Sequence, residues 1–491
     1  MLILGVWAFL RPVDAQQRAR YFRLSELPLV GRWIQEMTAS PWPLLIFKVA
    51  LVAVFLLVIV AGLFGTPIPE RNIATALTWN LWWAGLIVAI FLLGSAWCGV
   101  CPWDALATWL VRRRWWRRAH PNNSLNLRVP KGLRNVWPAL LMFIGLTWLE
   151  LGVGVTVSPY ATAALALLMV VLATVSLALF ERKAFCRYFC PVGRTVGFYA
   201  QLAPVELRPI DAQVCADCTT LECYHGNDNV EPCPTHLVMG RLTQNTYCTS
   251  CGNCTQSCPH QNISWRLRPQ SLEAISGARP HWDEAWFMLG LLALTSFHGL
   301  TMMPFWEIWM SQLAQFIGDS GQLLWSFTIG LLVSMAIPAA LYASVVAATG
   351  WLSGTHLPFK RLFSGLAFVT LPLAFAYHLA HNLNHLVRES GGVGALFLNP
   401  LGEGAQPMSA AEKHLRHMDL LISQDLLFAL QAGLIVFGFW IALKVLRHRG
   451  TSLLTTDAGI TGWQTLPMLL FITGMTVFNL WLLMQPMVMR M

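Results

Sequence analysis

The chain has 491 residues, of which 56% are hydrophobic and only 12% are charged. Soluble globular domains carry about a quarter charged residues, so this composition excludes an ordinary soluble protein and predicts a membrane protein. A net charge of +9 could indicate a nucleic-acid partner. The positions of the basic residues indicate instead that the net positive charge reflects membrane topology, and we expect no nucleic-acid partner.

Long apolar runs predict the transmembrane helices, since a helix needs about 20 apolar residues to cross a bilayer. Such runs lie at residues 43–64, 78–97, 137–157, 160–180, 284–304, 323–349, 363–387, 421–446 and 464–487. The predicted fold class is therefore an α-helical polytopic membrane protein with about nine transmembrane helices.

Lysine and arginine are distributed very unevenly between these runs. Of the 33 basic residues, 27 lie in the N-terminal segment and in the loops expected on the same side, and five lie on the opposite side. Because basic loops stay in the cytoplasm, we expect the N-terminus and every cysteine on the cytoplasmic side of a bacterial-type inner membrane.

The pattern of apolar and polar segments divides the chain into three parts. Residues 1–200 are expected to form an interfacial segment and a four-helix membrane unit. Residues 201–270 are polar and cysteine-rich and form an insert on the cytoplasmic side. Residues 271–491 are expected to form a five-helix membrane unit.

The insert contains the most specific motif of the chain. Cys248, Cys251, Cys254 and Cys258-Pro259 have the spacing C-x2-C-x2-C-x3-C-P. This run holds [4Fe–4S] clusters in bacterial ferredoxins, where its fourth cysteine binds the other of two clusters. The spacing therefore predicts a ferredoxin-like insert with two [4Fe–4S] clusters and a second run nearby.

The second run precedes the first and has wider spacing. It reads Cys215-x2-Cys218-x4-Cys223-x9-Cys233-Pro234. The crossed ligation of two-cluster ferredoxins assigns four cysteines to each cluster. One set is Cys215, Cys218, Cys223 and Cys258, and the other is Cys248, Cys251, Cys254 and Cys233. A structural zinc module is the alternative, although zinc has no need of the C-x2-C-x2-C-x3-C-P run.

Four further cysteines lie at helix ends and also finish in Cys-Pro. Cys98-x2-Cys101-Pro102 closes the second apolar run, and Cys186-x3-Cys190-Pro191 follows the fourth. They could hold a further cluster or another thiophilic metal. They could instead form a redox-active dithiol pair activated by nearby arginines, or serve only as packed helix-terminating turns.

With these motifs, residues 43–268 resemble the NapH/NosR group of membrane ferredoxin-type proteins, which includes the CcoG-type cupric reductase. Cys186-x3-Cys190-Pro191 matches the transmembrane C-x3-C-P motif of that group, and Cys98-x2-Cys101-Pro102 is one residue shorter. The resemblance implies electron transfer between the quinone pool and a respiratory or metal-handling partner.

Histidines are unusually frequent in the C-terminal membrane unit, where polar residues indicate function. His378, His381 and His385 share one face of the seventh run, and His298 lies near the end of the fifth. A b-type haem held by His298 and one of the other three is one interpretation. A copper or zinc site is another, and a polar helix–helix contact is the third.

Glu150, inside the third run, is the other ionisable residue of interest. It could accept a proton at a quinol site or form a structural pair with a polar neighbour.

Two functions follow from these features. The first is an electron-transfer subunit, a candidate quinol dehydrogenase, that connects the quinone pool or a membrane cofactor to a respiratory oxidoreductase through the clusters. The alternative is a copper reductase or assembly factor with a cuproenzyme partner. A transporter with a regulatory insert is a third hypothesis, but the paired broken helices typical of transporters are not evident.

Overall fold

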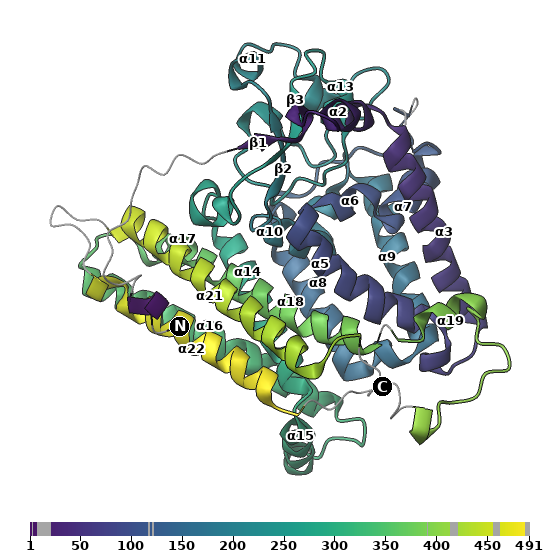
Figure 1. The fold of residues 1–491 in the computed structure, drawn as a ribbon, viewed down its shortest axis with the longest axis vertical. Coiled ribbons are helices and arrows are strands. Elements are labelled where there is room, and N and C mark those ends of the chain that lie inside the picture. Colours follow the sequence, from purple (N-terminus) through teal and green to yellow (C-terminus); the bar gives the residue numbers. More distant parts are fainter. Residues whose placement is uncertain are drawn as a thin grey trace.

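The computed structural model describes residues 1, 3–6, 21–115, 118–119, 122–389, 391–412, 421–454 and 462–486. Its main body is a bundle of long helices, and the cysteine-rich insert caps one end of that bundle, at the top of Figure 1. At the opposite end lie α15 (Pro304–Ile317) and α19 (Val393–Leu398).

Seven helical segments within the described residues are long and apolar enough to cross a bilayer. They are α3 (Trp42–Phe64), α4 to α5 (Ile73–Leu93), α9 (Pro159–Leu179), α16 (Leu324–Ser353), α17 to α18 (Phe359–Glu389), α21 (Gln424–Leu454) and the helix Trp463–Met484, which is most of α22. Each coincides with a predicted run, so the polytopic helical fold is confirmed.

Two of the nine predicted spans differ from the expectation. The run 284–304 forms α14 (Trp282–Thr301), which meets α15 at an angle of 92°, and only the pair together qualifies as a span. Pro304 starts α15 because a proline suits the first turn of a helix. The run 137–157 forms a shorter apolar helix, Trp137–Val153. The count is therefore seven, or eight if the bent pair is one span.

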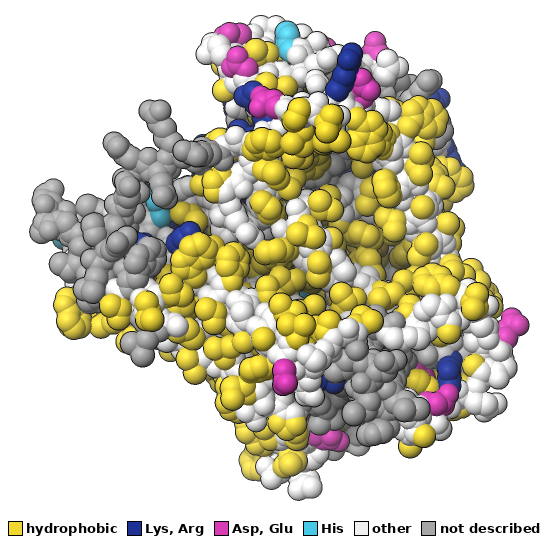
Figure 2. Space-filling view, viewed as in Figure 1, with side chains coloured by type: hydrophobic (Ala, Val, Ile, Leu, Met, Phe, Trp, Pro, Cys, Tyr) yellow, Lys and Arg dark blue, Asp and Glu magenta, His cyan; other side chains and the backbone are white. Residues whose placement is uncertain are grey.

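Apolar side chains cover the outside of the bundle. On α3, for example, Ile46 and Phe47 are 65% and 62% exposed. Figure 2 shows a broad band of hydrophobic side chains across the middle of one face, with most of the visible charged side chains above or below it. This is the surface that a hydrocarbon layer about 30 Å thick requires.

Helix α18 (Thr370–Glu389) lies in the centre of the bundle. It packs against α21, α14 and α5 (Ala84–Leu93), and most of its side chains are buried. Because this helix is surrounded by protein rather than lipid, its polar side chains can find partners on the neighbouring helices.

The insert is closed at its base by a small antiparallel sheet. Strand β2 (Val205–Pro209) leads into the insert and β3 (Ile263–Leu267) leads out of it, with Pro209 opposite Ile263. Strand β1 (Phe22–Arg23) pairs with the other edge of β3. The two ends of the cysteine-rich segment are thereby held next to each other.

A buried ionic network connects β2 and β3 of this sheet with the segment that follows. Glu206 on β2 accepts from Arg266 and Arg268 on or just after β3, at 2.7 and 2.9 Å. Arg208 links Glu206 to Glu273, whose carboxylate lies 2.7 Å from the Arg208 guanidinium. Each carboxylate is 3% exposed and has two or more cationic neighbours, as buried charges require.

The insert is also joined directly to the membrane bundle. Arg194, on α10 (Pro191–Tyr199), donates to the carbonyl oxygen of Thr246 at 2.8 Å. The hydroxyls of Ser95 and Ser250 lie 2.8 Å apart. Just after the insert, Arg449 of α21 donates to the carbonyl of Ala274 at 2.6 Å.

The closest approach between the two parts is at Gly197. A methyl group at this position would overlap the carbonyl oxygen of Thr246. We therefore expect Gly197→Ala to lower the free energy of unfolding of the insert by about 1–3 kcal/mol, the usual effect of overpacking. Trypsin should then cleave faster after Arg241. Gly145→Ala is the matched control, since that helical glycine has open space beside it. Equal cleavage rates in the two variants would contradict the expectation.

Candidate redox site

The first set of insert cysteines converges because of the sheet at its base. Cys215 follows β2 by six residues and Cys258 precedes β3 by five, and the paired strands bring these segments together. A small pocket is lined by the four cysteines of this set, Cys215, Cys218, Cys223 and Cys258. These are the thiols that the crossed spacing assigns to one cluster.

Asn262 connects the two ends of this set. Its side-chain amide donates to the sulfur of Cys215 and its backbone N–H donates to the sulfur of Cys258, both at 3.4 Å. The same side chain also bonds the backbone of Asp211. Hydrogen bonds to sulfur are one of the means by which proteins tune iron–sulfur potentials. Asn262 has no motif signature, so the sequence analysis missed it.

The second set gathers beside the first. The thiol of Cys233 lies within electrostatic range of those of Cys248, Cys251 and Cys254. Its sulfur also accepts from the backbone N–H of Leu237 at 3.3 Å.

The two sets lie next to each other in one small core. Cys254 packs in a buried cluster whose partly buried neighbours include Cys223 and Cys258. Two clusters bound by these two sets would therefore be close neighbours.

These insert cysteines are better suited to hold an iron–sulfur cluster than to act as free thiols. Burial raises the pKa of the Cys248 thiol to about 11 and that of Cys254 well above its ordinary value. These thiols therefore keep their protons at neutral pH unless a bound metal ion displaces the protons. Four convergent thiols, with N–H groups directed at the sulfurs, are what a [4Fe–4S] cluster requires.

The four remaining cysteines meet where the insert touches the bundle. Cys101 and Cys190 each precede a proline and cap the helices α7 (Pro102–Arg112) and α10. The Cys190 sulfur accepts from the backbone N–H of Gly193 at 3.2 Å. Cys98 and Cys186 lie within electrostatic range of Cys190.

An acidic residue lies at the centre of these four cysteines, the junction set (Cys98, Cys101, Cys186 and Cys190). Asp104 accepts from Lys183 at 2.5 Å and from the Cys186 thiol at 3.7 Å. The sequence analysis missed Asp104; its position three residues after Cys101, in the first turn of α7, was the available signal.

The junction set lies beside the second insert set. Cys98 is within electrostatic range of Cys248, and Gly99 passes so close to the carbonyl of Ser250 that a methyl group would lie 2.8 Å from it. The three sets thus follow one another from the top of the insert to the end of the membrane helices.

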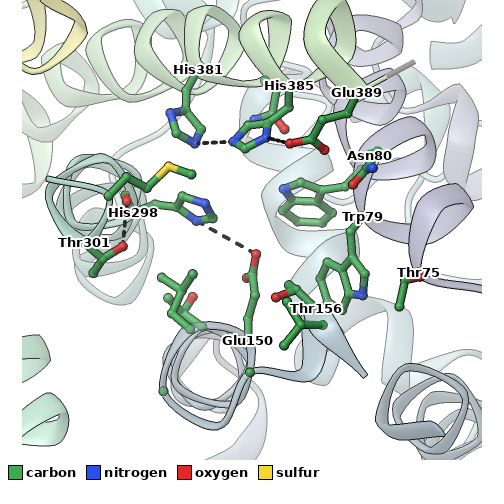
Figure 3. A pocket seen from close by; sticks show the side chains of 18 of the residues that line it. Thr75, Trp79, Asn80, Glu150, Thr156, His298, Thr301, His381, His385 and Glu389 are labelled. Carbon is green, nitrogen blue, oxygen red and sulfur yellow. Dashed lines mark hydrogen bonds and ion pairs between the residues drawn. The ribbon is translucent and has the colours of Figure 1, made fainter. Parts of the chain in front are cut away.

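A cavity of about 360 Å³ lies deeper in the bundle and is lined by all four predicted histidines and Glu150. Figure 3 shows three of these histidines, His298, His381 and His385, together with Glu150. The ligand nitrogens of His298, His381 and His385 all lie within 4.8 Å of one another. Glu150 faces His298 across the cavity, with 3.9 Å between its Oε1 and Nδ1.

His378 is placed differently from the other three. Its Nδ1 lies 3.3 Å from the hydroxyl of Tyr199, and its ring packs against Trp83. A further carboxylate that the sequence analysis missed, Glu389, lies 2.8 Å from Nδ1 of His385. Its spacing of four residues from His385 on one helix was the available signal.

A second cavity, of about 310 Å³, is mainly apolar and reaches towards the cysteine junction. Tryptophans line much of it, and Pro102 of the Cys101-Pro102 motif is one wall. Glu150 lines both cavities. It lies on a π-helical turn, Leu149–Val153, a local distortion that is frequent at functional sites.

Comparison with known proteins points to the same cysteine junction. A family described as "4Fe-4S binding domain" matches residues 75–119 and 162–203, the two segments that carry the junction cysteines. The predicted likeness to membrane ferredoxin-like 4Fe–4S proteins is confirmed. A curated relative is YccM of Escherichia coli (strain K12), whose name places it among electron transport proteins, with 30% identity over 117 residues.

The similar region is short in both proteins. It covers 23% of this chain and 30% of YccM, so the chain aligns with less than a third of that relative's length. No solved structure is significantly similar to the chain.

Proposed function

We propose that this protein transfers electrons between membrane quinol and a respiratory partner through two [4Fe–4S] clusters in the insert. The observation that supports this most directly is the order of the three cysteine sets. Cys223 and Cys258 of the Cys215 set pack against the buried Cys254. Gly99, next to Cys98 at the membrane end, closely approaches Ser250 in the Cys248 run. One-electron carriers in this order would connect the insert with the bundle.

The junction cysteines are assigned to a third metal centre or a redox-active thiol pair in this proposal. Asp104 and Lys183 lie beside the thiols. Burial raises the pKa of Cys190 to about 11, which opposes a free reactive thiolate. The match of the 4Fe-4S family to these segments supports the metal centre.

The apolar cavity is the proposed quinol site. Its tryptophan-rich walls suit a flat ring with an apolar tail, and Pro102 brings it next to the junction cysteines. Oxidation of one quinol releases two electrons and two protons. The clusters would supply one-electron acceptors when bound. Glu150 is positioned to accept the two protons in turn and to release each into the cavity shared with the histidines.

We place the insert on the cytoplasmic face of a bacterial-type inner membrane, as the distribution of basic residues predicts. The proposed partner, a respiratory oxidoreductase, would then dock on the cytoplasmic side. The copper-reductase alternative uses the same clusters but ends at a cuproenzyme.

Anaerobic purification with iron analysis and EPR tests the proposal. We expect about eight irons per chain for two clusters, or about twelve if the junction set holds a third. Clusters that are reduced by a soluble quinol analogue would support the quinol site. Four or fewer irons with stoichiometric zinc would overturn the two-cluster assignment.

Glu150→Gln tests the proton acceptor. A positioned acid–base group typically contributes a factor of 10²–10⁴, so we expect at least a 100-fold slower reduction of the clusters by quinol, with unchanged iron content. Stopped-flow bleaching of the cluster absorbance measures this rate. Glu307→Gln, a change at an exposed acid on α15, is the control. A wild-type rate in Glu150→Gln would remove Glu150 from the proposal.

A further inference from the structure

Three of the four membrane histidines form a compact cluster rather than a spaced pair. His381 and His385 come from α18, and His298 comes from α14 and packs its ring against His381 at a centroid distance of 4.8 Å. Figure 3 shows all three side chains directed towards the same part of the cavity.

We infer that His298, His381 and His385 bind one first-row transition-metal ion, in a site separate from the iron–sulfur clusters. The Nε2 atoms of His381 and His385 lie 3.2 Å apart. Two nitrogens bound to one ion at about 2.0–2.1 Å with a tetrahedral angle lie about 3.3 Å apart, so this pair already has the separation that coordination requires.

Glu389 orients His385 as a metal ligand. It lies 2.8 Å from Nδ1, so that nitrogen carries the proton and donates to the carboxylate, leaving Nε2 with a free lone pair. A carboxylate behind a histidine is the usual outer-shell partner of a metal ligand, because it fixes the ring and makes the ligand more basic.

Without an ion, the remaining contacts satisfy the histidines poorly. His381 must donate from Nε2 to His385, which leaves its buried Nδ1 as an unprotonated nitrogen with no hydrogen-bond partner. A cation between the two Nε2 atoms uses both lone pairs and removes the need for that arrangement.

The geometry favours a single ion over a haem. A haem needs two axial histidines with its flat ring between them, whereas here two neighbouring nitrogens of one helix face the same point and a third approaches it. Imidazole ligands suit copper, iron and zinc. Three protein ligands leave a further position open towards the cavity, where an external ligand or Glu150 can approach.

Cobalt(II) binding to the purified, chelator-treated full-length protein tests the site. Oxidised [4Fe–4S] clusters are EPR-silent, so high-spin cobalt can be observed beside them. We expect the wild type to bind one cobalt per chain more than His381→Ala or His385→Ala, because any cobalt held by the junction cysteines is common to all three. His378→Ala, which changes a histidine of the same cavity outside the trio, should retain this additional cobalt.

Glu389→Gln keeps all three ligands and distinguishes metal binding from a folding defect. We expect a 10–100-fold weaker cobalt affinity with unchanged iron content, the usual effect of losing an outer-shell partner. Equal cobalt binding in the wild type and in the His381→Ala and His385→Ala variants, or a haem absorption band that the same variants abolish, would overturn the inference. The iron count of the insert is measured separately, so failure of this site leaves the cluster proposal standing.

Discussion

Cys258→Ser is expected to damage the same cluster as Cys215→Ser, although Cys258 belongs by sequence to the Cys248 run. Each variant should lose the EPR signal of one reduced cluster and up to about four irons, and the signal lost should be the same in both. The physical reason is the β2–β3 pairing, together with Asn262, which bonds both sulfurs.

Cys233→Ser provides the reciprocal test. It should remove the signal that depends on Cys254, since Cys233 lies within electrostatic range of Cys248, Cys251 and Cys254 alike. EPR of the dithionite-reduced proteins at several temperatures separates the two signals. If Cys258→Ser instead removed the same signal as Cys254→Ser, the clusters would be uncrossed, and each run would bind its own cube.

The crossed assignment of the insert cysteines is a prediction from spacing, and the grouping of Cys215, Cys218, Cys223 and Cys258 around one pocket supports it. In two-cluster ferredoxins the last cysteine of such a run binds the other cluster, which leaves Cys258 to complete the wide Cys215 run. The positions of the long spans were likewise predictable, since apolar length alone decides whether a helix can cross a bilayer.

The remaining features depend on contacts between distant segments. The bend between α14 and α15 was not expected, because apolar length does not reveal where a chain turns by 92°. Asp104 was missed because its relation to Cys186 arises only when α7 packs against α9 and its following turn. The histidine spacing on α18 indicated one shared face, and His298 was already a candidate partner. Its distance from that face came from the packing of α14 against α18.

Arg268→Met is expected to destabilise the insert by about 3–5 kcal/mol, the usual effect of removing one partner of a buried ion pair. The Arg268 side chain is fully buried. Besides Glu206, it donates to the carbonyl oxygens of Ala200 and Ala203 at 2.8 and 3.0 Å. Methionine fills a similar volume but leaves these acceptors and part of the charge of Glu206 without a donor.

The temperature at which trypsin begins to digest the insert measures this loss in the solubilised protein. Arg32→Met is the matched control, because Arg32 forms an exposed pair with Glu36 and such pairs contribute little. Arg268→Lys should fall between the two, since lysine restores the charge but cannot reach both carbonyls and the carboxylate in one plane.

We expect the ionic network around Arg268 to affect electron transfer as well as the stability of the insert. The carbonyls that Arg268 holds end α10, the helix capped by Cys190, and Glu206 lies on the strand that leads to Cys215. One guanidinium thus fixes the junction cysteines relative to the first insert set. Arg268→Met should therefore slow electron exchange between quinol and the insert even at temperatures where the iron content is complete. A destabilised variant with a wild-type exchange rate would show that the network supports the fold alone.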